Sequence, residues 1–389
     1  MKKTPLAASL FLTALASTGT SVVWSGFPFI AKQYYEFNAY ENYALLIVIG
    51  LVYVFSAFAS SNTTAFANRL ISSRTILALL LFVQGVVCAL PLLYEGAWVI
   101  WCAGIIAGFC SAWLWPLTES YLVAGRHGEE MRRAIGWWNL VWMIAVAIAM
   151  ILIAELMEEH ASMAIVGLGV ANICAIFALP WFSAEPAEHN EIEVNANVPE
   201  KYKSLLKGAR VLLPLSYILN GVLAPILPFV FSRFMTADEI GKQVSLASIW
   251  MVSRVLVVIV MSRIPKWHGR WSTLWIAGIA MSLGFLGVLI AYDSTILLIS
   301  LGIFGLGIGA TYYLAIYYAM SVGRAGIDAS GTHEALIGGG YTIGPILGLS
   351  TVFFADSVDL EPFFSLGTVT MVLVGLSFCY FFAIWLKDR

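Results

Sequence analysis

Hydrophobic runs long enough to cross a bilayer recur along the whole chain, and they leave few possible folds. A membrane-spanning helix needs about 20 predominantly apolar residues. We identify twelve such runs, at residues 6–31, 41–62, 74–93, 97–124, 133–157, 161–182, 207–233, 240–262, 271–292, 295–322, 331–355 and 362–386. Only 11% of the residues are charged, against about 25% in soluble domains. The sequence therefore predicts an all-α membrane protein with twelve transmembrane helices.

The first run begins like a secretory signal peptide, with Lys2 and Lys3 followed by an apolar stretch. That stretch continues as far as Ile30, which is too long for a cleaved signal. We therefore interpret it as the first membrane span.

Lysine and arginine residues predict the orientation of the chain. If the N-terminus is cytoplasmic, 17 of the 21 Lys and Arg residues lie in inside segments, three (Lys32, Arg233 and Lys242) lie outside, and Arg254 lies within a span. Such an excess in short loops favours the cytoplasmic side. We expect a multi-pass protein of the inner or plasma membrane with both termini in the cytoplasm.

A polar stretch, residues 183–206, divides the chain into two sets of six spans. It predicts an N-terminal bundle at 1–182, a cytoplasmic linker at 183–206 and a C-terminal bundle at 207–389. The two halves look like copies, because Pro28-Phe29 ends the first span and Pro228-Phe229 ends the seventh. Internal duplication of a helical bundle is typical of transporters, whose solute site lies near the midplane between the repeats.

Several functional classes find no support in the sequence. It contains no GxxxxGK[ST] motif for nucleotide phosphates, and its five cysteines and five histidines show no metal-ligand spacing. The net charge of −2 gives no basic excess for nucleic acid. We expect no catalytic residues, no cofactor, no metal and no nucleic-acid partner.

Glu119 is a charged residue inside an apolar run, where a carboxylate costs ~2.5 kcal/mol or more unless it faces a cavity or a partner. Arg132 and Arg133 open the next span and are the nearest candidate partners. Two interpretations stay open: a structural ion pair at the membrane edge, and a direct role in binding substrate or a proton.

Arg254 is the most informative candidate for substrate binding. It precedes Arg263 by nine residues, which places it roughly 13 Å into the membrane at 1.5 Å per residue. Trp250 lies one turn earlier and could flank the guanidinium. The alternative is that the side chain extends to the membrane interface. We favour a cavity-facing arginine, whose paired donors suit a carboxylate or phosphate.

Other polar and aromatic residues at mid-depth are weaker candidates. Asn220 precedes Gly221 and Pro225, which predict a break in the helix; Asn220 could bind solute or another helix. Aromatic stripes serve either packing or an amphipathic pocket. The remaining binding candidates are Trp24, Trp115, Trp138, Asn139, Trp142, Tyr312, Tyr313, Tyr317 and Tyr341.

His333 and Glu334 open the eleventh run. His333 could titrate in the working pH range, and Glu334 could pair with Arg133. The alternative is an ordinary helix start, with Glu334 in its favourable first turn. The two interpretations are compatible.

With twelve spans, a central cytoplasmic linker and its loop motifs, the sequence resembles the major facilitator superfamily. The loop after the second span resembles the family's GxxxDRxGRR motif through Asn68-Arg69 and Arg74, and Gly269-Arg270 repeats part of it. Residues 340–348 resemble GxxxGPxxG, which we interpret as a helix bend with close packing. The resemblance implies two pseudo-symmetric six-helix bundles and alternating access. It also implies that Glu119 and Arg133 form a cytoplasmic gate.

These observations predict a secondary active transporter of a small organic solute, proton-coupled and monomeric, with an anionic or zwitterionic substrate. One alternative is an exporter of amphipathic or cationic drug-like molecules, in which Glu119 recognises the cation. Another is a non-transporting membrane receptor built on the same fold.

Overall fold

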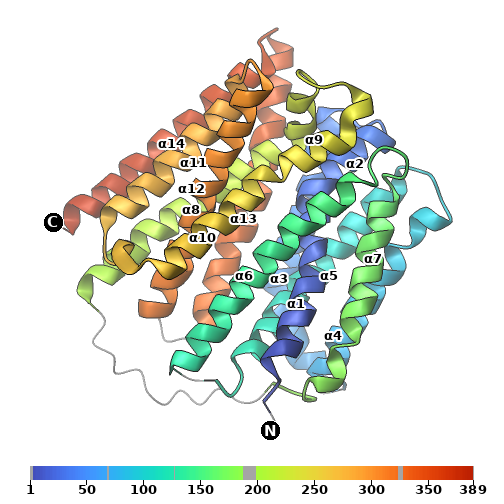
Figure 1. The fold of residues 1–389 in the computed structure, drawn as a ribbon, viewed down its shortest axis with the longest axis vertical. Helices are drawn as coiled ribbons and strands as arrows, with labels where there is room; N and C mark the ends of the chain where they lie inside the picture. Colours follow the sequence, from blue (N-terminus) through green and yellow to red (C-terminus); the bar gives the residue numbers. More distant parts are fainter. Residues whose placement is uncertain (1–2, 68–69, 127, 187–198, 323–326, 389) are drawn as a thin grey trace. The chain divides into compact units, whose positions relative to one another are not determined.

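The computed structural model describes residues 3–67, 70–126, 128–186, 199–322 and 327–388, without the side chains of residues 60–67, 128, 132, 320 and 327–334. These residues form helices and contain no strand (Figure 1). The helices are α1 (Leu6–Ser21), η1 (Val22–Gly26), α2 (Phe27–Tyr34), α3 (Ala39–Ala67), α4 (Ser73–Val87), η2 (Leu90–Leu92), α5 (Trp98–Val123), α6 (Gly128–Ala154), α7 (Met163–Ile176), η3 (Leu179–Trp181), α8 (Glu200–Phe231), η4 (Ala237–Glu239), α9 (Ile240–Ala247), α10 (Ile249–Arg263), η5 (Pro265–Trp267), α11 (Trp271–Ile290), α12 (Ser294–Val322), α13 (Ile327–Ser357) and α14 (Pro362–Lys387).

The predicted spans are confirmed. Within the described residues, twelve helical segments are long and apolar enough to cross a membrane, one for each predicted run. The largest difference in bounds is at α8, which begins at Glu200 and so includes the last part of the predicted linker. Glu200 lies in the first turn, where a negative charge interacts favourably with the helix dipole, and it pairs with Lys203 at 2.9 Å.

The first span contains a π-helical turn. The Phe27 N–H donates to the Val22 carbonyl, five residues back, and η1 widens the helix between α1 and α2. Pro28 has no N–H to give to the Trp24 carbonyl, so an ordinary α-helical pattern cannot run through this point. Trp24 lies in the wide turn, and its ring meets the edge of Tyr53 with centroids 6.2 Å apart. Such turns are frequent at functional sites.

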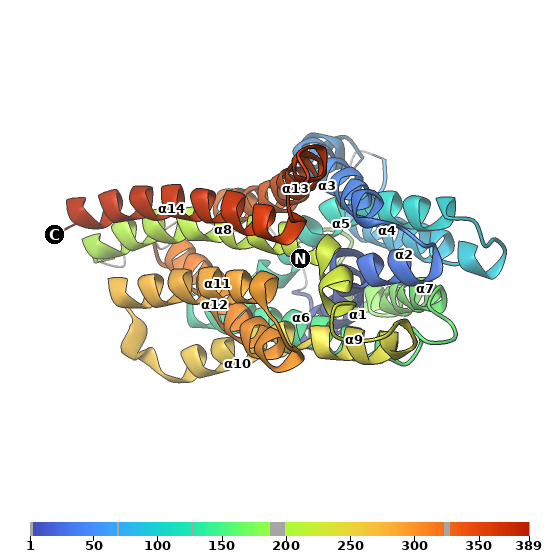
Figure 2. The same cartoon turned by 90° about the horizontal axis from the view of Figure 1, so that it is seen from above.

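The chain forms two compact units, coloured along the sequence in Figures 1 and 2. Unit 1 contains residues 1–37, 48–193 and 238–244. Unit 2 contains residues 38–47, 194–237 and 245–389. The first part of α3 is thus grouped with the C-terminal helices and the start of α9 with the N-terminal helices. The linear boundaries predicted from the sequence stay a prediction.

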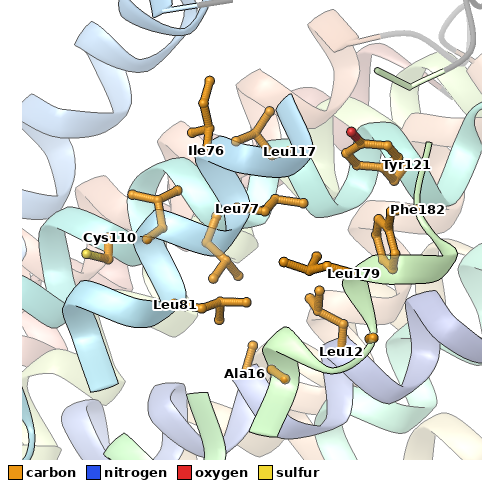
Figure 3. Close-up of a cluster of buried hydrophobic side chains, with 14 residues drawn as sticks. Leu12, Ala16, Ile76, Leu77, Leu81, Cys110, Leu117, Tyr121, Leu179 and Phe182 are labelled. Atoms are coloured by element: carbon orange, nitrogen blue, oxygen red, sulfur yellow. The ribbon is translucent and has the colours of Figure 1, made fainter. Parts of the chain in front are cut away.

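Unit 1 has a hydrophobic core in which α1, α4 and α5 meet the end of the sixth span (Figure 3). Leu12 of α1, Leu77 of α4 and Leu179 of η3 are buried there. Cys110 is a free cysteine within this core, which agrees with a packing role.

The start of the predicted linker is anchored on unit 1. The Tyr121 hydroxyl donates to the carbonyls of Ser183 and Ala184 at 3.0 and 2.9 Å. At the first turn of α4, the Ser73 N–H donates to Glu185 Oε1 at 3.0 Å, and Arg74 Nη1 donates to the Phe182 carbonyl at 3.1 Å. Arg74, the arginine retained from the loop motif, therefore holds the chain that leaves the sixth span. Asn68 and Arg69 lie outside the described residues.

Arg126 fastens the turn between α5 and α6. Its side chain is almost fully buried and donates to the Leu122 carbonyl at 2.5 Å and to the Thr4 carbonyl at 2.6 Å. Glu130 lies 3.9 Å from Arg126 Nε and also pairs with Lys3. These contacts connect the N-terminal residues of the chain to the start of α6.

In unit 2, glycines on α12 allow it to pack closely against α10, and glycines on α13 allow it to pack closely against α8. We call these the glycine surfaces of α12 and α13. A Cβ added at Gly305 of α12 would lie 2.0 Å from the Trp250 carbonyl oxygen, and one at Gly309 would lie 2.9 Å from Arg254 Cα. On α13, a Cβ at Gly340 would lie 2.4 Å from Tyr217 Cβ, and one at Gly344 would lie 2.5 Å from the Ile218 carbonyl oxygen. These helices can approach so closely only without side chains at these positions.

The break predicted near Asn220 is wrong, because α8 is continuous through Pro214, Pro225 and Pro228. Side chains from the start of α3 bind carbonyls in this proline-rich part of α8. Tyr43 donates to the Val222 carbonyl at 2.9 Å, and Asn42 Nδ2 donates to the Pro225 carbonyl at 3.2 Å. Neighbouring helices and polar side chains thus allow a proline-containing helix to persist in an apolar protein.

Candidate functional site

Arg254 lies within α10, away from both ends of that helix. It is on α10 and only 5% exposed. Its Nη2 donates to the Tyr217 hydroxyl at 3.1 Å. Its Cζ lies 4.9 Å from the ring centroid of Tyr312 and 6.0 Å from that of Tyr217. The side chain thus points among residues of α8 and α12, which argues against the alternative of extension to the interface.

Further residues extend this contact into a cluster. The rings of Tyr217 and Tyr341 meet edge to face, with centroids 4.9 Å apart and an angle of 69°. Asn220 Nδ2 lies 3.4 Å from the Tyr341 hydroxyl. We call Arg254, Tyr217, Tyr312, Tyr341 and Asn220 the Arg254 cluster. It combines four predicted binding residues from four helices.

The glycine surfaces give the Arg254 cluster its geometry. Gly309 lets α12 approach the backbone of Arg254, which brings Tyr312, three residues later, towards the guanidinium. Gly340 lets α13 approach Tyr217, which brings the adjacent Tyr341 against the Tyr217 ring. The cluster therefore depends on close helix packing.

Tyr217 belongs to the cluster but is absent from the sequence candidates. A signal for it does exist, because Tyr217 precedes Asn220 by three residues and so shares a face of α8. Trp250, a further binding candidate, packs its ring on Phe304 with centroids 6.3 Å apart, and its role in binding stays a prediction. The rings of Tyr312 and Tyr217 lie over the guanidinium.

The chemistry of the cluster suits an anionic group. Phenol rings and an amide are neutral at physiological pH, so they orient the guanidinium without cancelling its charge. Arginine offers paired donors that match the two oxygens of a carboxylate or phosphate. The hydroxyls of Tyr217 and Tyr341 and the Asn220 amide add groups that can donate and accept hydrogen bonds.

The tryptophan candidates of α5 and α6 contact neighbouring residues of unit 1. Trp115 and Trp138 meet edge to face with centroids 6.2 Å apart, and Trp138 is buried in a hydrophobic cluster. Trp142 Nε1 donates to Asn139 Oδ1 at 3.1 Å, and Asn139 Nδ2 donates to the Ile135 carbonyl at 2.9 Å. These contacts support the packing alternative within this unit.

Tyr313 and Tyr317 lie in a different aromatic cluster, at the turn between α10 and α11. Trp267 lies 5.7 Å from Tyr313 and 4.8 Å from Tyr317 between ring centroids, and His268 stacks on Tyr317 at 4.6 Å. Burial lowers the pKa of His268 below its usual range, so this imidazole is neutral near pH 7. Tyr313 and Tyr317, the two binding candidates beside Tyr312, therefore belong to this second aromatic cluster.

The gating candidates are described only in part. Glu119 is half-buried in α5, and Arg133 is exposed in α6. The ion pair between them stays a prediction. The side chains of His333 and Glu334 lie outside the described residues. Across the described part of the chain, no group of three or more His, Cys, Asp and Glu side chains could hold a metal ion.

Comparison with known proteins identifies the family. Residues 9–332 match the sequence profile of the Major Facilitator Superfamily. No curated protein matches the chain significantly.

Among solved structures, the chain is similar to the nucleoside transporter NupG, with 14% identity, TM-score 0.66 and coverage of 99% of this chain and 99% of that chain. It is also similar to an inward-facing bacterial homologue of the human lysosomal transporter Spinster, with 12% identity, TM-score 0.68 and coverage of 99% and 97%. A third is a POT family transporter in complex with 5-aminolevulinic acid, with 11% identity, TM-score 0.70 and coverage of 97% and 96%. The fold expected from the sequence is confirmed, and the chain belongs to the major facilitator superfamily of non-enzymatic membrane transporters.

Proposed function

We propose that this protein is a secondary active transporter that moves a small anionic or zwitterionic organic solute by alternating access, with protons as the coupling ion. The observation that carries this proposal is the Arg254 cluster. It holds a buried guanidinium among neutral aromatic rings, 3.1 Å from the Tyr217 hydroxyl. A transporter of this family needs a solute site within the membrane, and this cluster supplies both charge and hydrogen-bonding groups there.

The solved structure with 5-aminolevulinic acid supports the same class of solute. That ligand carries a carboxyl and an amino group, and the structure that binds it shares the fold of this chain. A carboxylate is the group that a guanidinium binds through two parallel hydrogen bonds. We therefore propose that the Arg254 cluster binds the carboxylate or phosphate of the transported solute.

The substrate class can be tested on the purified protein. Carboxylates, phosphates, nucleosides and lipophilic cations would be screened for thermal stabilisation, since a ligand that binds the folded state raises its stability. Stabilisation by anions supports the proposal. Stabilisation by lipophilic cations alone supports the alternative that the protein exports amphipathic or cationic drug-like molecules. The best ligand would then be used for counterflow in proteoliposomes. Binding without exchange would identify a receptor.

Proton coupling can be tested at Glu119. If this carboxylate carries the proton, Glu119→Gln should abolish the dependence of uptake on a pH gradient, because the amide cannot titrate. If it is a gate residue, the charge swap Glu119→Arg with Arg133→Glu should recover part of the lost transport, because an ion pair depends mainly on opposite signs. The measurement is solute flux into proteoliposomes with and without a pH gradient. Unchanged flux and coupling in Glu119→Gln would contradict both roles.

We also propose that the protein is a monomer in the inner or plasma membrane with both termini in the cytoplasm. In a variant lacking the five native cysteines, Tyr292→Cys should react with a membrane-impermeant maleimide added outside intact cells. Lys266→Cys should react only after the cells are opened. Tyr292 is 78% exposed and Lys266 is also exposed, so accessibility does not limit either reaction. The reverse pattern would invert the topology that the charge distribution predicts.

A further inference from the structure

Three basic side chains surround the ends of α8, α11 and α14 in unit 2. Arg270 immediately precedes α11, Lys387 is the last residue of α14, and Lys201 lies in the first turn of α8. All three are exposed. Lys201 lies two turns before Gly208 on the same face, and a Cβ at Gly208 would lie 2.8 Å from Trp271 and 2.9 Å from Phe381. The packing thus gathers these three helix ends around Trp271, and Figure 2 shows α8 beside α14.

The carboxylate of Asp388, which lies next to Lys387, already accepts a hydrogen bond from the protein. Asp388 Oδ2 accepts a hydrogen bond from Trp271 Nε1 at 2.6 Å. Among the described residues, Lys201, Arg270 and Lys387 form none of the ion pairs that the structure contains. Glu200, next to Lys201, pairs with Lys203 at 2.9 Å, so the three positive charges at these helix ends are not neutralised by either carboxylate.

The adjoining surface of α11 and α14 is apolar and exposed. On α11, Ile276, Ile279 and Leu283 are 67%, 46% and 61% exposed and share one face. In α14, only 17% of the residues in its 18-residue apolar stretch are buried, whereas 83% are buried in the corresponding stretch of α8. In a multi-pass membrane protein, an apolar surface of this kind faces lipid chains.

Aromatic side chains mark the boundary between the apolar and basic surfaces. Trp275 packs against Phe381 with centroids 4.6 Å apart and against Trp385 at 6.2 Å. Trp385 is two residues before Lys387. Tryptophan is enriched at the level of lipid headgroups, where its ring and its N–H meet different environments.

We propose that Lys201, Arg270 and Lys387 bind the headgroup of an anionic phospholipid, whose acyl chains lie along the exposed apolar surface of α11 and α14. The occupant follows from charge complementarity and from the continuity of the basic site with a lipid-facing surface. A soluble phosphate would use the charges and leave the adjoining apolar surface unused. This site lies at the helix ends and does not rest on the proposed transport function.

The test uses the full-length protein in phosphatidylcholine bilayers that contain phosphatidylglycerol with brominated acyl chains. Bromine quenches the fluorescence of nearby tryptophans. The dependence of this quenching on the fraction of brominated phosphatidylglycerol in the bilayer therefore gives the preference of the protein for phosphatidylglycerol over phosphatidylcholine. A double variant, Trp275→Phe and Trp385→Phe, lacks the two tryptophans at this site. The difference between its quenching and that of the parent is the part that comes from this site. We expect that part to show a preference for phosphatidylglycerol that weakens with added salt.

Variants that remove one charge at a time test whether the lipid preference comes from these three residues. Lys201→Gln, Arg270→Gln and Lys387→Gln should each lower the preference about fivefold, the effect expected of one basic residue at a membrane surface. The matched control removes two exposed charges at the end of α10 and in η5, through Arg263→Gln and Lys266→Gln together. It should leave the preference unchanged. An equal loss in the control and in the single site variants, or no loss in any of them, would overturn the proposed site.

Discussion

We expect Arg254→Lys to keep the positive charge yet lower solute affinity about ten- to a hundred-fold. Lysine offers a point charge in place of two parallel donors, and a lost charged hydrogen bond costs about 1.5–3 kcal/mol. The variant also loses the planar group that lies 4.9 Å from the Tyr312 ring. Arg254→Ala should be weaker still and should no longer distinguish the anion from its neutral ester. The measurement is equilibrium binding of the carboxylate that best stabilises the parent protein.

The control for this prediction is on the same helix. Arg263→Lys makes the same chemical change at the exposed end of α10 and should leave affinity unchanged. If Arg254→Lys and Arg254→Ala both bind the solute as the parent does, and only stability falls, then Arg254 is a packing residue. The anionic-substrate proposal would then be wrong, and the exporter of amphipathic molecules would be the better hypothesis.

Two adjacent glycines of α13 should respond in opposite ways to alanine. In Gly340→Ala the new Cβ would lie 2.4 Å from Tyr217 Cβ and 3.0 Å from the Pro214 carbonyl oxygen, so α13 must move away from α8. Overpacking of this kind typically costs about 1–3 kcal/mol. We expect a clearly lower melting temperature, together with weaker solute binding because Tyr217 and Tyr341 separate.

Gly339→Ala is the matched control, since a Cβ at Gly339 meets nothing within 4 Å. Alanine favours a helix over glycine by up to about 1 kcal/mol, so this variant should be as stable as the parent or slightly more stable. Thermal unfolding monitored by tryptophan fluorescence compares the two variants. Equal melting temperatures for both would show that α8 and α13 do not approach as closely as the Gly340 contact requires.

The sequence alone identified the twelve spans and the family, because the bilayer imposes one length and one polarity on every crossing helix. It also singled out Arg254, since a charge within an apolar span is conspicuous whatever its neighbours are. Asn220, Tyr312 and Tyr341 could be named as candidates but not grouped, and Tyr313 and Tyr317 looked equivalent to Tyr312. Helical spacing reports the face of one helix and says nothing about the neighbour that this face meets.

The tertiary structure decided those neighbours. Gly309 and Gly340 allow α12 and α13 to approach α10 and α8, and this contact joins Tyr217, Tyr312 and Tyr341 to Arg254. The anchoring of Glu185 on the first turn of α4 is likewise a contact between residues far apart in sequence. Spans and their charges are local properties of the chain, and a sequence displays them directly. The composition of a buried cluster depends on which helices pack together and how closely, and only the folded protein determines that.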